Sequence, residues 1–142
     1  MFAESTIPRL RRAFVATRGV DGAADATGEA IAYAWEHWQR VRTMENPAGY
    51  LYRVGQSRTK PRRRLQLPQP SEARIPDVEP ELIPALLELS EQQRCAVWLV
   101  HACEWRHREV AEALGITTSA VSTHVERGMQ KLRDHLEVDA RA

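Results

Sequence analysis

The segment EVAEALGITTSAVSTHV, residues 109–125, has the spacing of two helices joined by a sharp turn. Two helices that cross steeply need a small residue where they nearly touch, and a turn residue that adopts positive φ. Ala111 meets the first requirement, and Gly115, four residues later, meets the second. Apolar residues stand where the shared core requires them, at Val110, Leu114, Ile116 and Val121. The segment therefore predicts a helix-turn-helix.

The second helix of this motif has an outward face rich in small hydroxyl residues, and Thr117 or Thr118 can cap its start. Such residues allow a helix to sit deep in a major groove, where hydroxyls and free backbone amides reach phosphates or base edges. Arg127, one turn further on, can reach a phosphate or a guanine, and His124 can point toward the DNA backbone. The predicted outward face is Thr118, Ser119, Ser122, Thr123, Glu126, Arg127 and Gln130. DNA binding is the favoured interpretation, and a helical hairpin with solvated Ser and Thr is the alternative.

The charge of the chain is divided between its halves. Residues 1–75 carry 13 basic and 7 acidic side chains, a net +6, whereas residues 76–142 carry 7 and 12, a net −5. Affinity for DNA depends largely on neutralised phosphates, so a motif in the acidic half is expected to bind DNA weakly alone. A second DNA contact or a protein partner would have to supply the remaining affinity.

Prolines divide the chain in the same place. Six of the eight lie between residues 61 and 84, in a stretch with neither helical period nor strand alternation. We therefore expect an all-α protein of two small helical domains, at residues 1–60 and 80–142, joined by a linker at 61–79. After the linker, Ser90 and Gln93 have the spacing of a capping box at the start of a helix.

Three helices are predicted before the linker. The first spans about Pro8 to Thr17, with Leu10, Ala13 and Phe14 inward, and Gly19 and Gly22 bracket the turn after it. The second spans about Ala23 to Arg40, and its apolar stripe places Trp35 and Trp38 in the core. The third begins with Asn46 as N-cap and Pro47 as first residue, with Tyr50, Leu51 and Val54 inward. We expect Gly55 and Pro61 to break it.

A basic run follows this third helix. Six cations and no acid occur in the twelve residues from 53 to 64: Arg53, Arg58, Lys60, Arg62, Arg63 and Arg64. A nucleic-acid backbone is the favoured partner, and a solvated charge run is the alternative. Base stacking on Trp35, Trp38, Tyr50 or Tyr52 is a further, weaker possibility.

Several classes of function are disfavoured. Cys95 and Cys103 lie eight residues apart in one predicted helix, about 12 Å along its axis, too far to pair, so we expect two free, buried thiols. His101, Cys103 and His107 do not converge as metal ligands, and no nucleophile with a base stands out. We expect no catalysis, cofactor, metal or small-molecule substrate. The chain has no apolar run of about 18 residues and no signal-like start, so a cytoplasmic location is expected.

Residues 86–136 resemble region 4 of sigma factors of the sigma-70 family, of the extracytoplasmic-function type, through LS..QR.AV.L, EVAEALGIT.SAV and V.RGMQKLR. AADATGEAIAYAWEHW and NPAGYLYRV are similar to region 2. The resemblance implies a transcription initiation factor that binds core RNA polymerase and promoter DNA, with an anti-sigma factor as a further expected partner. Region 4 would read the upstream (−35) element through Ser119, Ser122, Thr123 and Arg127. Region 2 would contact polymerase and the downstream (−10) element through the helices around Glu29–Trp38 and Tyr50–Arg58.

Two alternatives remain open. A LuxR-type regulator shares the spacing of Val121 and His124, but it does not account for NPAGYLYRV or the aromatic second helix. A degenerate sigma-like protein would bind polymerase or a regulator without initiating transcription, and the acidic second half and the expected break in the third helix favour it.

Overall fold

The computed structural model describes residues 2–59 and 82–141. The prediction of an all-α fold is confirmed within these ranges, which contain helices and no strand. The N-terminal half contains α1 (Phe2–Glu36), α2 (Trp38–Val41) and α3 (Pro47–Arg58). The C-terminal half contains α4 (Leu82–Leu87), α5 (Glu91–Val97), the π-helical segment η1 (Trp98–Ala102), α6 (His107–Leu114) and α7 (Thr118–Arg141). The expected linker at 61–79 lies outside the described residues.

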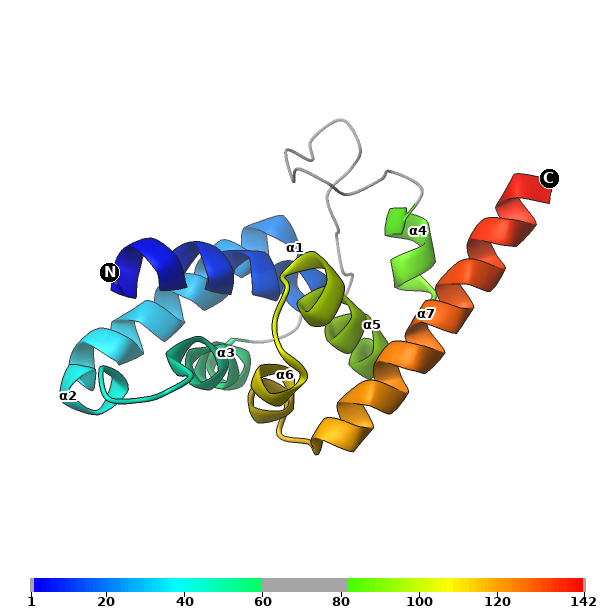
Figure 1. Cartoon of the computed structure of the whole chain (residues 1–142). Coiled ribbons are helices and arrows are strands. Elements are labelled where there is room, and N and C mark those ends of the chain that lie inside the picture. Colours follow the sequence, from blue (N-terminus) through cyan, green and yellow to red (C-terminus); the bar gives the residue numbers. More distant parts are fainter. Residues whose placement is uncertain (1, 60–81, 142) are drawn as a thin grey trace.

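The first two predicted helices are both present within α1, and non-helical Gly19 separates them as the predicted turn required. The chain reverses direction there (Figure 1). Gly19 has φ 70° and ψ −179°, a conformation that residues with a Cβ rarely adopt. The expected start at Pro8 is wrong, because the helix begins at Phe2 and Pro8 lies inside it. Leu10, Ala13 and Phe14 are fully buried, as their spacing predicted.

The predicted burial of Trp35 and Trp38 is wrong. The Trp35 side chain is 83% exposed and Trp38 is 36% exposed, whereas Ala30 and Ala34 of the same stripe are buried. The small alanines make the close contact with the rest of the half, so the tryptophans lie at the edge of the stripe. Both line an apolar cavity of about 370 Å³ with Phe2, Ile7 and Ile31.

Helix α3 begins as expected and ends later than expected. The Asn46 Oδ1 accepts a hydrogen bond from the Gly49 amide at 3.1 Å, and Pro47 is the first helical residue. The predicted break at Gly55 is wrong, because α3 continues to Arg58. A Cβ at Gly55 would lie 2.3 Å from Phe14 Cζ and 3.0 Å from the Ala26 carbonyl oxygen. Gly55 therefore allows α3 to approach α1 closely.

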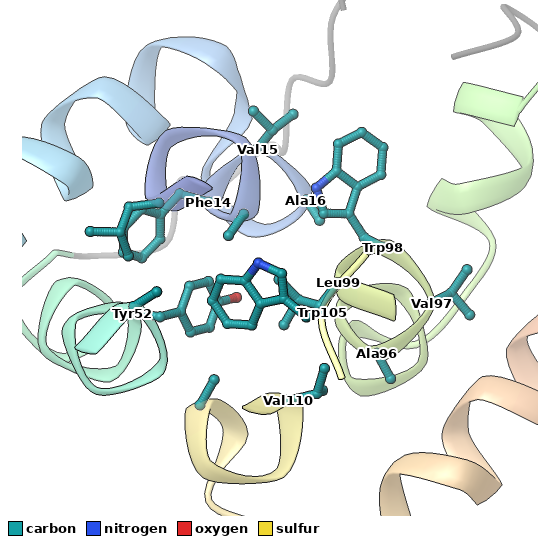
Figure 2. Close-up of a cluster of buried hydrophobic side chains, with 14 of the residues drawn as sticks. Phe14, Val15, Ala16, Tyr52, Ala96, Val97, Trp98, Leu99, Trp105 and Val110 are labelled. Carbon is teal, nitrogen blue, oxygen red and sulfur yellow. The ribbon is translucent and has the colours of Figure 1, made fainter. Parts of the chain in front are cut away.

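The two halves share one hydrophobic core, although they are separated in sequence by the proline-rich stretch. Figure 2 shows Phe14 of α1 and Tyr52 of α3 facing Leu99 and Trp105 of the C-terminal half. The Tyr52 ring stacks on Phe14 with centroids 4.8 Å apart and meets Trp105 edge-on at 5.9 Å. The indole Nε1 of Trp98 donates to the carbonyl oxygen of Arg12 at 2.8 Å. Aromatic packing therefore holds the halves together in a closed arrangement.

Candidate nucleic-acid interface

The predicted helix-turn-helix is formed by α6 and α7. Gly115 ends α6 with φ 68°, and the Ile116 amide donates back to the Ala111 carbonyl oxygen at 3.0 Å, which closes the turn. Val110, Ala111 and Val121 are buried between the helices, and Leu114 and Ile116 pack partly buried against the core. Thr117 is the residue that caps α7, since its Oγ1 accepts from the Ala120 amide at 3.1 Å. The spacing of Ala111 and Gly115 therefore predicted both the turn and its mechanism.

The outward face of α7 carries the predicted DNA-contacting side chains. Thr118, Ser119, Thr123 and Arg127 are exposed, and Ser122 and His124 are half-buried. Two hydroxyls are directed to the helix itself: Ser122 Oγ donates to the Thr118 carbonyl oxygen at 3.3 Å, and Thr123 Oγ1 donates to that of Ser119 at 3.1 Å. A hydroxyl that donates in this way still accepts hydrogen bonds through its lone pairs. No acidic residue occupies the first turn of α7, so its positive end is not neutralised locally.

His107 extends this surface from α6. Its Nδ1 lies 3.2 Å from Ser122 Oγ, so the first helix of the motif holds a side chain of the second.

 The α7 contacts follow from helical spacing alone, whereas this contact depends on how the two helices cross.

Only some of the basic residues predicted to contact nucleic acid lie in the part of the chain that the structure describes. Arg53 and Arg58 are exposed on α3. Arg53 lies at the turn of the helix-turn-helix, with its Nη2 3.9 Å from the position that a Cβ would take on Gly115. Arg62 and Arg63, with Lys60 and Arg64, lie outside the described residues. The structure therefore brings one predicted cation of the N-terminal half next to the motif of the C-terminal half.

An aromatic and basic cluster on the N-terminal half was not predicted as a unit. The hydroxyls of Tyr33 and Tyr50 lie 2.9 Å apart, and this hydrogen bond is the main cause that raises the pKa of Tyr33 above its ordinary value. Arg58 lies over the Tyr33 ring at 5.0 Å, and Arg40 lies over the Tyr50 ring at 5.6 Å. Half-buried aromatic rings with adjacent cations form a surface suited to unpaired bases. The sequence signal was Tyr50 beside the basic run, but Tyr33 joins it only through the packing of α1 on α3.

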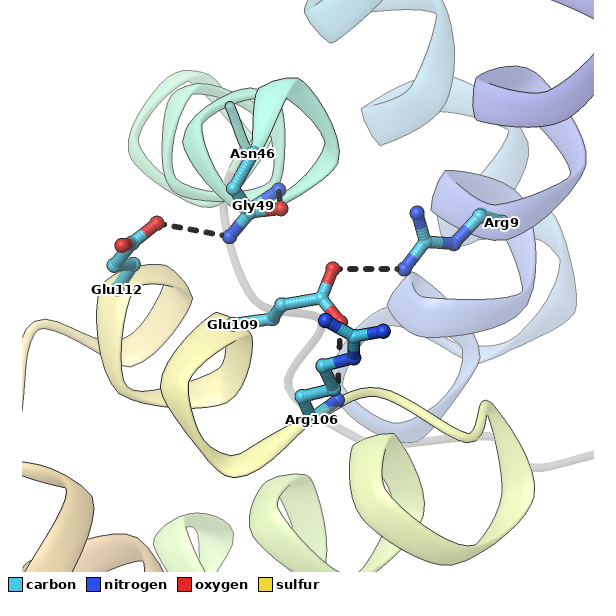
Figure 3. A network of polar contacts seen from close by, with 6 residues as sticks. All are labelled: Arg9, Asn46, Gly49, Arg106, Glu109 and Glu112. Atoms are coloured by element: carbon cyan, nitrogen blue, oxygen red, sulfur yellow. Dashed lines mark hydrogen bonds and ion pairs between the residues drawn. The ribbon is translucent and has the colours of Figure 1, made fainter. Parts of the chain in front are cut away.

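Polar contacts join the two halves around the start of α6 (Figure 3). Glu109 accepts from the Arg106 amide through Oε1 at 3.0 Å and from Arg9 Nη2 through Oε2 at 3.1 Å. Asn46, the cap of α3, donates through Nδ2 to Glu112 Oε2 at 3.0 Å. These residues are partly exposed, so the ion pair contributes at most about 1 kcal/mol to stability. Their effect is to fix the orientation of α6 against α1 and α3 (Figure 1).

Residues 81–132 match the family model described as sigma-70, region 4. The matched residues include α6 and the start of α7, which form the helix-turn-helix. The RNA polymerase sigma-E factor of Streptomyces antibioticus is 29% identical to it over 135 residues, which cover 84% of this chain and 75% of that protein. The predicted resemblance to sigma factors is thus confirmed, and the LuxR-type alternative is not favoured.

A similar fold is found in a solved structure. It is similar to a structure described as the sigma factor RpoE in complex with the anti-sigma factor NepR from Bartonella quintana. The TM-score is 0.70 at 18% sequence identity, and the match covers 96% of this chain and 95% of the other. The match extends over both halves, so their arrangement here resembles that of the other chain. No helix in the described part of this chain is long and apolar enough to cross a membrane.

Proposed function

We propose that this chain binds core RNA polymerase and directs it to promoters, with the outward face of α7 contacting an upstream (−35) element. The observation that carries this assignment is the exposed series of Ser119, Thr123 and Arg127, directly after a closed helix-turn-helix turn. The free amides at the start of α7 and its small side chains suit close approach to a DNA backbone, and Arg127 suits a phosphate or guanine. The side chains act by positioning and binding, and the proposed function involves no catalysis. Because core polymerase and chromosomal DNA share the cytoplasm of a bacterial cell, that is the proposed location.

The N-terminal half is proposed to supply two further contacts. The surface of Trp35 and Trp38 offers exposed aromatic area beside an apolar cavity, which suits a protein partner, here polymerase. The cluster of Tyr33, Tyr50, Arg40 and Arg58 suits the unpaired bases of a melted downstream (−10) element. An anti-sigma factor would act by covering one of these surfaces.

Two measurements test the proposal together. Core polymerase is used to capture the full chain, and the same mixture is assayed for promoter-directed transcription in vitro. We expect both capture and transcription from a promoter that core polymerase alone does not use. Capture without transcription from any promoter tested would favour the degenerate sigma-like alternative, and failure of capture would contradict both readings.

A further inference from the structure

A cavity of about 310 Å³ lies between the two halves, away from the outward face of α7. Its walls come from α1 and α3 on one side and from α5 and α6 on the other. The lining residues are Arg18, Tyr52, Gln56, Glu91, Gln92, Cys95, Ala113 and Leu114. The volume lies at the lower end of the range typical of small-molecule sites, and the lining combines apolar and polar groups as such sites do. The proposed contacts with DNA and polymerase do not use it.

Arg18 brings a buried positive charge to this cavity, with a side chain only 4% exposed. Its Nε donates to Thr59 Oγ1 at 3.0 Å, and its Nη2 donates to the carbonyl oxygens of Gln56 and Thr59 at 3.1 and 3.3 Å. All three acceptors are neutral, and no carboxylate of the described residues forms an ion pair with Arg18. The third nitrogen, Nη1, has no acceptor among these residues. Because a buried charge is unfavourable without a counter-charge, Arg18 is suited to an anionic group in the cavity.

Gln56 contributes to the same cavity a hydrogen-bond acceptor that lacks a donor. Its Nε2 donates to Thr17 Oγ1 at 3.1 Å and to the Tyr52 hydroxyl at 2.8 Å. Its Oε1 is buried and has no donor among the described residues. A buried acceptor without a partner is unfavourable, so this oxygen is suited to an N–H or O–H donor. The exposed carboxylate of Glu91 lines the cavity as well, which favours a donor that is positively charged.

We propose that this cavity binds a small zwitterion that carries a carboxylate and an ammonium group, as a free amino acid does. The carboxylate binds Arg18, and the ammonium group is placed toward Gln56 Oε1 and Glu91. Apolar atoms of the ligand contact Tyr52 and Leu114. Each of the two unpartnered groups of the cavity is then satisfied by one end of the same molecule.

Binding would favour the closed arrangement, because both halves line the cavity. A ligand that binds only the closed form, at 100 times its Kd, shifts the equilibrium toward that form about 100-fold. This consequence rests on the proposed function, in which the halves must separate on a promoter. Binding itself does not depend on that function, so a chain that binds the ligand but fails in transcription would refute only the proposed function.

The test measures ligand binding to the full chain by thermal unfolding and isothermal titration calorimetry. The probes are the twenty common amino acids, each alone, with acetate and ethylamine as matched molecules that carry one charged group each. We expect at least one amino acid to raise the Tm with increasing concentration and to bind one per chain, while acetate and ethylamine do neither at equal concentration. Failure of all twenty to bind, or equal binding of acetate, would overturn the proposal.

Two variants locate the site. Ala113→Met adds a flexible side chain to the wall of the cavity, and Arg18→Lys keeps the charge but loses the planar guanidinium. We expect each to weaken binding of the active amino acid at least about tenfold. Gly28→Ala, on an exposed position of α1 with open space around it, is the control and should leave binding unchanged. Circular dichroism verifies that each variant is folded. Unchanged affinity in either variant that folds would place the ligand elsewhere and overturn the assignment.

Discussion

Arg127 is the side chain on α7 whose removal tests DNA contact most directly. We expect Arg127→Ala to lower promoter-directed transcription by about 5- to 150-fold, the range of about 1–3 kcal/mol for loss of a specific base contact. The side chain is exposed, so stability and capture by core polymerase should not change. Arg133→Ala, the same substitution at an exposed position further along α7, is the matched control. Loss of capture together with transcription would indicate misfolding rather than loss of a DNA contact.

Substitution of Trp35 tests contact with polymerase separately from stability. Its side chain is 83% exposed, so Trp35→Ala should barely change the free energy of unfolding. If the tryptophan is a central contact with polymerase, its removal should weaken capture by about tenfold or more. The measurement is a titration of core polymerase with labelled chain. Val20→Ala removes another exposed apolar side chain of α1 and should have no such effect.

The reactivity of the Cys95 and Cys103 thiols measures how far each side chain is protected from solvent. Burial raises the pKa of Cys95 and of Cys103 to about 12. At pH 8.5 the thiolate fraction in the folded chain is therefore smaller than in the unfolded chain by on the order of a thousandfold. We expect alkylation by iodoacetamide to be slowed accordingly in buffer and to be fast in urea. Rapid modification of Cys95 in the native chain would mean that the halves separate readily.

The same shifts predict a dependence of stability on pH. A thiol whose pKa is higher in the folded chain binds its proton more tightly there. Its contribution is fully present below the unfolded pKa, near 8.5, and is lost as the pH rises toward 12. Denaturant unfolding at pH 8, 9 and 10 should show falling stability. In Cys95→Ala this fall should be smaller, and an equal fall would assign the effect to other groups.

At the scale of the elements, α1 and α3 depend on a glycine at their contact. Gly55→Ala places a methyl group against Phe14 Cζ and the Ala26 carbonyl oxygen, and the backbone atom cannot rotate away. Overpacking of this kind costs about 1–3 kcal/mol, which outweighs the gain in helix propensity of about 1 kcal/mol. We therefore expect a lower Tm.

Gly28→Ala is the control for this prediction. It lies in α1 with no atom within 4 Å of the added Cβ, so only the propensity gain applies and the Tm should rise slightly. Thermal unfolding of both variants measures the difference. Equal effects of the two substitutions would contradict the close approach of α3 to α1.

Local patterns predicted the elements well where one residue decides a backbone geometry. Gly115 adopts the left-handed conformation that the turn requires. Asn46 at the start of α3 and Ser90 at the start of α5 each accept a hydrogen bond from a backbone amide of the helix. Patterns failed where packing decides. Trp35 fits an apolar stripe but lies outside the contact made by the alanines, and Gly55 resembles a helix break but permits a helix contact.

The candidate site also has one part that local spacing predicted and another that depends on packing between elements. The outward face of α7 follows from 3.6-residue periodicity, and its exposure agrees with the sequence at Thr118, Ser119, Thr123 and Arg127. The pairing of Tyr33 with Tyr50 joins residues of α1 and α3, which no local spacing relates. The cavity beside Arg18 needs the two halves together, and the proline-rich stretch between them indicated only that they were separate units.

At the scale of the whole molecule, the closed arrangement is too compact for the proposed function. A packed chain of 142 residues has a radius of gyration of about 15 Å. Promoter elements centred about 25 base pairs apart are separated by about 85 Å, at about 3.4 Å per base pair. Simultaneous contact with both therefore requires α6 to leave α3.

The boundary between the halves contains groups that oppose closure. Three buried polar atoms lack a partner among the described residues: Arg12 Nε, Gln56 Oε1 and Trp105 Nε1. Each belongs to a residue at this boundary, and an unsatisfied buried group costs about 1–3 kcal/mol. These groups offset part of the aromatic packing, so closure is weaker than its apolar contacts alone would suggest.

Trp105 is expected to contribute most to closure. Its side chain is 2% exposed and meets Tyr52 across the boundary, so Trp105→Ala should destabilise the closed form by about 3–5 kcal/mol. Small-angle X-ray scattering should then give a larger radius of gyration. Glu109→Gln removes the ion pair with Arg9 but leaves Arg9 over the Trp105 ring, so it should change the radius little. Expansion of Glu109→Gln alone would mean that charge rather than aromatic packing closes the molecule.

The shared core also affects how the chain folds during synthesis. The stacked pair of Phe14 and Tyr52 is covered by Trp105 only when that residue has left the ribosome, about 45 residues after the N-terminal half is complete. At about 5–20 residues per second, that interval lasts roughly 2–9 seconds. Throughout it, the newly made half exposes an aromatic surface that the finished molecule hides. A chaperone that binds apolar segments is thus expected to engage nascent chains ending between the two halves, and to release them once the second half emerges.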